Sequence, residues 1–74
     1  EVSKMLANKL KEVRKAKGIS QKELAHKLNT TQQSVSSWEN GRTIPRPYQQ
    51  QFIEKFFNTP KEVIFFGAYN YNSL

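Results

Sequence analysis

Apolar residues recur at spacings of three and four along most of the chain, in five blocks separated by short stretches that contain Gly, Pro or Asn. This spacing places the apolar side chains of a block on one side of an α-helix. No block shows the alternation of apolar and polar residues that a half-buried strand requires, and no stretch is repeated. The pattern therefore predicts an all-α domain of five short helices around one core.

The first two blocks carry ordinary helix start and stop signals. We expect the first helix over about residues 3–17, followed by Gly18, a residue type that commonly terminates helices. The second helix opens with Ser20-Gln21-Lys22-Glu23, a capping box in which the Ser hydroxyl and the Glu carboxylate bond free amides of the first turn. The apolar stripes of these two helices are Leu6, Leu10 and Val13, and then Leu24, Ala25 and Leu28.

The third block predicts a short helix that follows the second after only a few residues. Thr31 is its expected N-cap, and Thr30 with Gln33 offers an alternative capping box one residue earlier. The helix continues to Glu39 or Asn40, because Gly41 then ends it. Two short helices at this spacing are typical of a helix-turn-helix, in which the second helix enters the major groove of DNA.

The third helix has two chemically different faces. At about 100° per residue, Val35 and Trp38 point toward the core. For Trp38 we favour this core position over stacking on a base or ligand. The residues that point outward together are Gln32, Gln33, Ser36 and Ser37.

Two further helices and a tail complete the chain. Pro45 and Pro47 mark a loop and then the start of the fourth helix, whose core residues are predicted to be Phe52, Ile53, Phe56 and Phe57. Asn58 can stop this helix in a left-handed conformation, and Thr59-Pro60-Lys61-Glu62 combines a cap, a first-turn proline and a capping box for the fifth. We therefore expect one domain over residues 3–66 and a separate aromatic tail over residues 67–74.

Composition favours a binding module over an enzyme. Twelve Lys and Arg against six Glu and no Asp give a net charge of +6, which points to a polyanionic partner. Catalysis needs positioned pairs of titratable groups, and the sequence offers no such pair. His26 is the only histidine and there is no Cys, so we predict no catalytic residue, no metal and no cofactor.

The chain also lacks the apolar run of a membrane span and the pattern of a signal peptide, so we expect a cytoplasmic protein that has no membrane partner.

The outward face of the third helix is unusual for a basic protein. No charge occurs from Thr30 to Trp38, whereas a solvated helix face of a Lys-rich domain ordinarily carries Lys or Glu. Amides and hydroxyls can both donate to and accept from the edges of bases, and Gln can pair bidentately with adenine. We therefore predict that this face reads bases.

These residues also resemble a known family. The motifs are Gly18-Ile19-Ser20-Gln21-Lys22-Glu23-Leu24-Ala25, Thr30-Thr31-Gln32-Gln33-Ser34-Val35 and Trp38-Glu39-Asn40-Gly41-Arg42-Thr43. Together they resemble the Cro/CI-type, XRE-like helix-turn-helix family of phage repressors over roughly Leu6 to Phe65, and the third helix resembles the recognition helix of a lambdoid repressor. The resemblance implies a compact lambda-repressor-like domain.

The resemblance assigns roles to individual residues. It implies that Gln32 and Gln33 read bases, with Ser36 and Ser37 further along the same face, and that Gln21 holds a phosphate and braces Gln32. The phosphate contacts that it implies after the recognition helix fall on Asn40, Arg42 and Thr43, and Arg46 adds another basic group nearby. Arg14 and Glu39 resemble a structural salt bridge between the first and third helices.

Two departures from the family pattern affect specificity and phosphate binding. Ser37 stands where close relatives have a third Gln, and a shorter side chain reaches less far into the half-site. The loop over residues 42–47 also differs from theirs in its length and its prolines.

The leading expectation is a regulator of transcription, a repressor or Cro-like protein of a phage or prophage that acts in a bacterial host cell and binds operator DNA as a homodimer. The alternative is an antirepressor or modulator that uses the same scaffold to bind a partner repressor protein. The apolar and aromatic residues near the C-terminus allow self-association or binding of a partner protein on the one hand, or packing across the core on the other; they are Phe65, Phe66, Tyr69, Tyr71 and Leu74.

Overall fold

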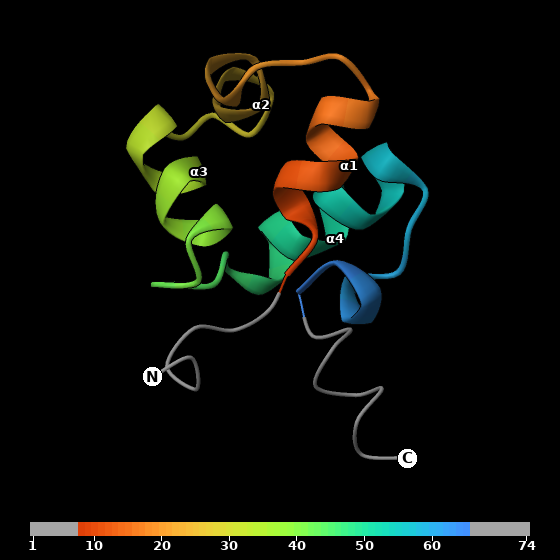
Figure 1. Ribbon diagram of the computed structural model, residues 1–74. Coiled ribbons are helices and arrows are strands. Elements are labelled where there is room, and N and C mark those ends of the chain that lie inside the picture. Colours follow the sequence, from red (N-terminus) through yellow and green to blue (C-terminus); the bar gives the residue numbers. More distant parts are fainter. Residues whose placement is uncertain (1–7, 66–74) are drawn as a thin grey trace.

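The computed structural model describes residues 8–65, and these residues form an all-helical domain (Figure 1). Four helices are α1 (Leu10–Ala16), α2 (Gln21–Lys27), α3 (Gln32–Glu39) and α4 (Pro47–Phe57). Residues 61–65 are helical as well, and no strand occurs between residues 8 and 65. The predicted all-α fold of five helices is confirmed. The tail over residues 67–74, with Phe66, lies outside the described residues.

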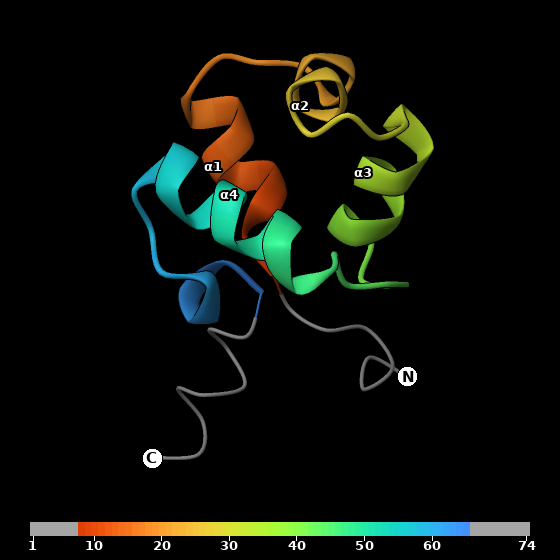
Figure 2. The same ribbon diagram turned by 180° about the vertical axis from the view of Figure 1, so that it is seen from behind.

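The helices surround one core to which each of them contributes. In Figures 1 and 2, α2 lies at one end of the domain and the last helical turn, at residues 61–65, lies toward the other end. α3 lies at one side of the domain, next to α2. The core residues are Leu10, Leu24, Ala25, Leu28, Val35, Trp38, Ile53, Ile64 and Phe65. Val35 is fully buried and Trp38 is 5% exposed, so the predicted inward face of α3 is confirmed.

The turn between α2 and α3 is held by hydrogen bonds within it. Asn29 has a φ of 55°, a left-handed conformation that Asn tolerates better than most residues. The amide of Thr30 then donates to the carbonyl of Ala25. Thr31 is the N-cap of α3, because its hydroxyl accepts from the amide of Ser34 at 3.1 Å. The first of the two predicted caps is therefore confirmed.

α1 begins later than the sequence pattern predicts. Within the described residues, Asn8 and Lys9 are not helical, and the helix starts at Leu10. The side chain of Asn8 explains the late start, because its oxygen accepts from the amide of Leu10 at 3.2 Å and its nitrogen donates to the carbonyl of Trp38 at 3.0 Å. The amide of Lys9 donates to the carbonyl of Ile64. These bonds hold the chain entering α1 against α3 and the final helical segment.

One prediction about the aromatic residues is wrong. Phe52 is 38% exposed instead of buried, although it keeps helical spacing with the core residues of α4. Phe65 is 2% exposed and packs in the core, which is one of the alternatives that the sequence left open for the apolar residues near the C-terminus. Helical periodicity is too coarse to separate core from edge positions, because the outcome depends on which helices cover each face. Within residues 8–65 no helix is long and apolar enough to cross a membrane.

Candidate nucleic-acid interface

The outer face of α3 carries amide and hydroxyl groups. Gln32 and Gln33 are exposed, and Ser36 and Ser37 are half-buried. The last residue of the helix, Glu39, is charged, but its side chain is only 3% exposed. The accessible surface of α3 is therefore neutral in a chain whose net charge is +6.

Gln21 connects the two helices of the motif. It is the first residue of α2, where the capping box of Ser20 and Glu23 starts the helix. The side-chain oxygen of Gln21 accepts a hydrogen bond from the side-chain nitrogen of Gln32 at 3.3 Å. The start of α2 and the start of α3 are thereby joined at the surface through two amide side chains.

A buried ion pair lies behind this contact. The guanidinium of Arg14 donates through Nε and Nη2 to the two carboxylate oxygens of Glu39, the second at 3.3 Å. The side chains of Arg14 and Glu39 are 8% and 3% exposed. Nη1 of Arg14 also donates to the carbonyl of Ile19 at 2.9 Å, so the same guanidinium holds the segment that leads into α2.

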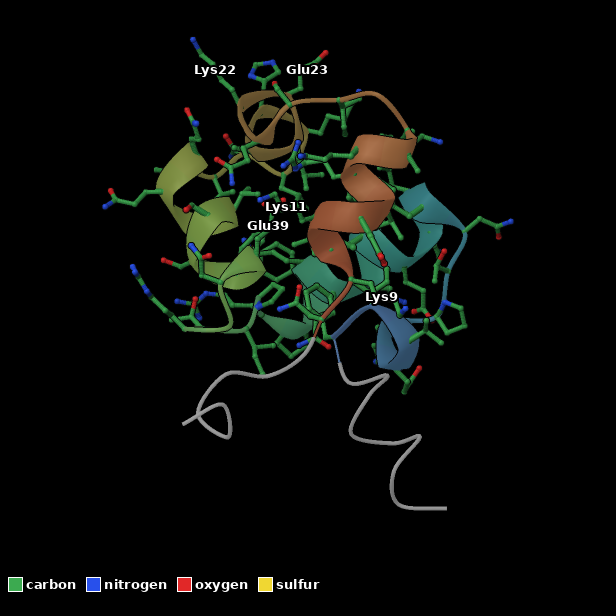
Figure 3. The ribbon with its side chains drawn as sticks, viewed as in Figure 1. Lys9, Lys11, Lys22, Glu23 and Glu39 are labelled. Carbon is green, nitrogen blue, oxygen red and sulfur yellow. The ribbon has the colours of Figure 1, made fainter. Side chains whose placement is uncertain are left out.

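The ion pair and the surface amides form one network. Nε2 of Gln21 donates to Oε1 of Glu39 at 3.0 Å, while Oε1 of Gln21 accepts from Gln32. Hydrogen bonds therefore run from α1 through α3 and α2 to the first residue of α3. Figure 3 shows Glu39 lying between α3 and α1, whereas Lys22 and Glu23 project from the outer end of α2.

The contact between Gln21 and Glu39 did not emerge from the sequence analysis, although helical geometry contains a hint of it. Seven residues separate Gln32 from Glu39, which is close to two full turns at about 100° per residue. The two residues therefore share one side of α3, and a long polar side chain from the neighbouring helix can bond both.

The residues predicted to bind phosphate fall into two groups. Gln21 lies at the start of α2 and is half-buried. The others are exposed and follow α3 along the chain: Asn40, Arg42, Thr43 and Arg46. Gly41, with a φ of 74°, turns the chain at the end of α3, and the amide of Arg42 donates to the carbonyl of Ser37. The loop thus leaves the C-terminal end of the candidate recognition helix with its polar side chains in solvent.

Arg46 has an additional structural position that the sequence analysis missed. It precedes Pro47 at the start of α4, and its amide donates to Oε1 of Gln49 at 2.9 Å. Gln49 is 7% exposed, so a buried side chain caps the first turn of α4. The spacing is that of a capping box with Arg in place of Ser or Thr, and for that reason the usual pattern did not reveal it. Arg46 itself is exposed.

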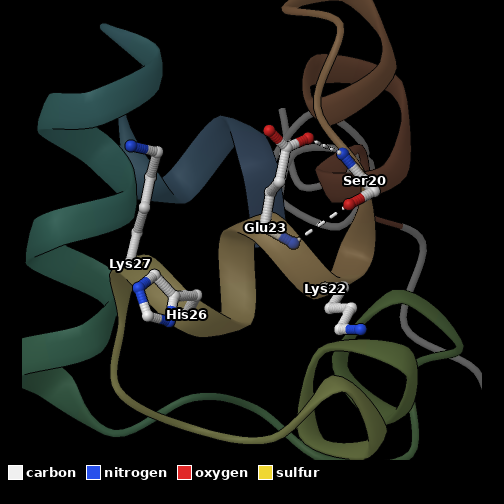
Figure 4. A pocket seen from close by; sticks show the side chains of 5 residues that line it. All are labelled: Ser20, Lys22, Glu23, His26 and Lys27. Atoms are coloured by element: carbon white, nitrogen blue, oxygen red, sulfur yellow. Dashed lines mark hydrogen bonds between the residues drawn. The ribbon is translucent and has the colours of Figure 1, made fainter.

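A surface hollow beside α2 offers no catalytic arrangement. It is lined by Ser20, Lys22, Glu23, His26 and Lys27. Figure 4 shows the carboxylate of Glu23 bonded to the amide of Ser20, and the hydroxyl of Ser20 bonded to the amide of Glu23. The only carboxylate of the hollow is thus used to cap α2. Within residues 8–65 no three acidic, His or Cys side chains are grouped as metal ligands.

Comparisons with known proteins give the same motif. A family model described as helix-turn-helix matches residues 10–64. The HTH-type transcriptional activator BcrR of Enterococcus faecalis is 30% identical to the chain over 59 residues, a match that covers 80% of this chain and 29% of that protein. The chain therefore spans less than a third of the length of this relative.

Proposed function

The chain belongs to the helix-turn-helix family, and from this membership we propose that it is a sequence-specific DNA-binding regulator of transcription. It inserts α3 into the major groove of an operator half-site. One observation carries the proposal: the accessible face of α3 holds amides and hydroxyls and no charge, inside a domain with a net charge of +6. Lys or Arg on this face would be attracted to any nearby phosphate, whereas neutral Gln side chains can pair selectively with the donor and acceptor groups of a base edge.

Each part of the interface has its own task in this proposal. Gln32 and Gln33 read bases near the start of the helix, and Ser36 and Ser37 contact the groove further along. Phosphates are bound on either side of the helix, by Gln21 before it and by the exposed loop after it. The loop residues that do this are Asn40, Arg42, Thr43 and Arg46.

We further propose that the protein acts as a homodimer and as a repressor or Cro-like regulator of phage or prophage origin. A dimer places two recognition helices about 34 Å apart, one turn of DNA, and so reads a palindrome. The motif over residues 30–35, with its two adjacent glutamines, supports the phage-type reading. The named relative is an activator. A reporter gene placed behind the recovered operator therefore tests whether this protein represses or activates transcription.

The decisive experiment selects bound sequences from a random DNA duplex pool and then compares variants on the recovered site. We expect a palindrome, and we expect Gln32→Ala and Gln33→Ala each to lose about 1–3 kcal/mol of discrimination at one base pair per half-site. Affinity for unrelated DNA should change little. Ser34→Ala is the matched control, because Ser34 lies on the same helix outside the predicted reading face. If neither Gln variant alters the sequence preference, α3 does not read bases in this way.

A protein-binding role is the second candidate, and exposed apolar side chains in the second half of the domain favour it. Ile44, Tyr48, Phe52 and Val63 are 39%, 65%, 38% and 40% exposed. In this case the protein is an antirepressor or modulator that binds a partner repressor. A gel-shift panel at moderate salt, with and without a repressor encoded nearby, separates the two: the modulator forms a tight heterodimer and binds no DNA alone.

A further inference from the structure

We infer that Glu39, a buried residue that does not face the groove, determines which way round the amide of Gln32 is presented to DNA. Glu39 is then a positioning residue for sequence specificity. The inference rests on the proposed reading of bases by Gln32 and adds a requirement for it. The observation behind it is the continuous hydrogen-bonded path from Glu39 through Gln21 to Gln32.

The first step concerns the carboxylate. An ionised Glu only accepts hydrogen bonds, whereas a Gln amide has one end that donates and one that accepts. Glu39 therefore bonds Gln21 only through the Nε2 end of its amide, and this is the contact at 3.0 Å. Arg14 donates to both carboxylate oxygens of Glu39, at a site where both side chains are at least nine-tenths buried, so Glu39 acts as an acceptor toward this neighbour as well.

In the second step, the fixed orientation of the Gln21 amide determines the orientation of the Gln32 amide at the surface. With Nε2 turned toward Glu39, Oε1 is the free end of Gln21, and it accepts from Nε2 of Gln32 at 3.3 Å. A reversed Gln32 amide would place its own oxygen against the oxygen of Gln21, two acceptors with no hydrogen between them. The charge of Glu39 thus orders two amides in sequence, and the second one lies on the reading face.

The consequence is chemical selectivity. Gln32 keeps one amide hydrogen and its oxygen for DNA, which is the donor and acceptor pair that meets N7 and N6 of adenine. Turning the amide over exchanges donor and acceptor and opposes the amino group of adenine with an amide nitrogen. A Gln whose amide turns freely distinguishes bases less well than one that is held in a single orientation.

The experiment compares Glu39→Gln with a variant of matched stability. A Gln at position 39 can donate or accept, so it no longer orders Gln21 or Gln32. We expect discrimination between the preferred base pair and its competitors at the Gln32 position to fall about tenfold, within the range of one bidentate contact. Ile53→Ala is the control, because Ile53 is fully buried in α4, outside the network, and its loss destabilises the domain without touching the amides. Discrimination should remain at the wild-type level in this variant.

Discrimination is a ratio of affinities, so the change of net charge in Glu39→Gln cancels from it. If Glu39→Gln folds and discriminates as well as the wild type, or if Ile53→Ala loses as much discrimination, the inference is wrong. Should Glu39→Gln fail to fold, the double variant Arg14→Met/Glu39→Gln removes both charges of the buried pair and carries the same test.

A measurement on the free protein separates this inference from the proposed function. The side-chain NH2 resonances of Gln21 and Gln32 report their hydrogen bonds without DNA, and we expect both to shift in Glu39→Gln and neither to shift in Ile53→Ala. Unchanged Gln32 resonances in Glu39→Gln overturn the amide order. Shifted resonances together with a Gln32→Ala variant of unaltered sequence preference support the amide order and overturn base reading by Gln32.

Discussion

Single residues with unusual backbone conformations position the helix-turn-helix. Asn29 adopts a φ of 55° between α2 and α3, and the amide that follows it bonds back to Ala25. Residues with a Cβ pay for this conformation through a close approach of Cβ to a carbonyl oxygen, and Asn compensates better than most because its side chain can bond locally. The turn between the two helices of the motif thus favours a residue that adopts a positive φ with little strain.

We therefore expect Asn29→Ala to destabilise the domain by about 1–2 kcal/mol, the strain of a left-handed residue with a Cβ. Asn29→Gly is the control and should be nearly neutral, because Gly adopts a positive φ without strain. Urea unfolding followed by circular dichroism measures both. Equal stability of the Ala and Gly variants would show that the turn tolerates another conformation.

At the scale of elements, α3 is attached to its neighbours by both apolar and polar contacts. Val35 and Trp38 bury its inner face in the core, and Glu39 joins its last turn to Arg14 of α1. The ion pair is nearly inaccessible to water, so either charge left alone there would lack a partner in a region of low dielectric. The C-terminal end of α3 is consequently held against α1 by the buried ion pair.

From this burial we expect Arg14→Met to reduce the free energy of unfolding by roughly 3–5 kcal/mol, because the carboxylate of Glu39 remains buried without its counter-charge. The double variant Arg14→Met/Glu39→Gln should recover a large part of this loss, since it leaves no unpaired charge. Thermal and urea unfolding of the two variants supplies the comparison. A double variant that is less stable than Arg14→Met would contradict the argument.

At the scale of the whole molecule, the basic residues and the neutral face that we propose reads bases occupy different parts of the chain. The net charge of +6 comes from basic residues outside the segment from Thr30 to Trp38. When a basic residue neutralises a DNA phosphate, counterions are released from the DNA. Contacts of this kind make binding depend on the salt concentration, whatever the sequence of the DNA. In the proposed function, the neutral face of α3 contributes to the choice among sequences.

A variant of Arg42 tests whether the basic loop residues bind phosphate without regard to sequence. Arg42→Ala should weaken binding to specific and unrelated DNA by similar factors and reduce the slope of log K against log salt by about 1, the loss of one phosphate contact. Lys55→Ala is the matched control, since it removes the same charge from the exposed surface of α4. Fluorescence anisotropy over a range of salt concentrations gives both slopes. Equal slopes for the two variants would place Arg42 away from the phosphates.

Local signals in the sequence were sufficient for the number and order of the helices, the caps of α2 and α3, the stop at Asn58 and the inward position of Trp38, but not for the start of α1. Each of these follows from side chains within a few residues of one another, through helical period, capping and tolerance of positive φ. The neutral outer face of α3 was visible for the same reason. It is a property of one helix and its spacing.

Contacts between distant residues required the folded chain. The start of α1 depends on Asn8 bonding Trp38, 30 residues away, and the burial of Phe65 depends on where the final helical segment meets the core. The path from Glu39 to Gln32 runs through Gln21, which is 18 residues from one and 11 from the other. Hydrogen bonds of this kind form only after core packing has brought the helices together, so no local pattern specifies them. The residue types on the outer face of α3 are therefore determined by the sequence itself, whereas the orientation of the Gln32 amide, through which we propose that it reads a base, follows from the packing of three helices.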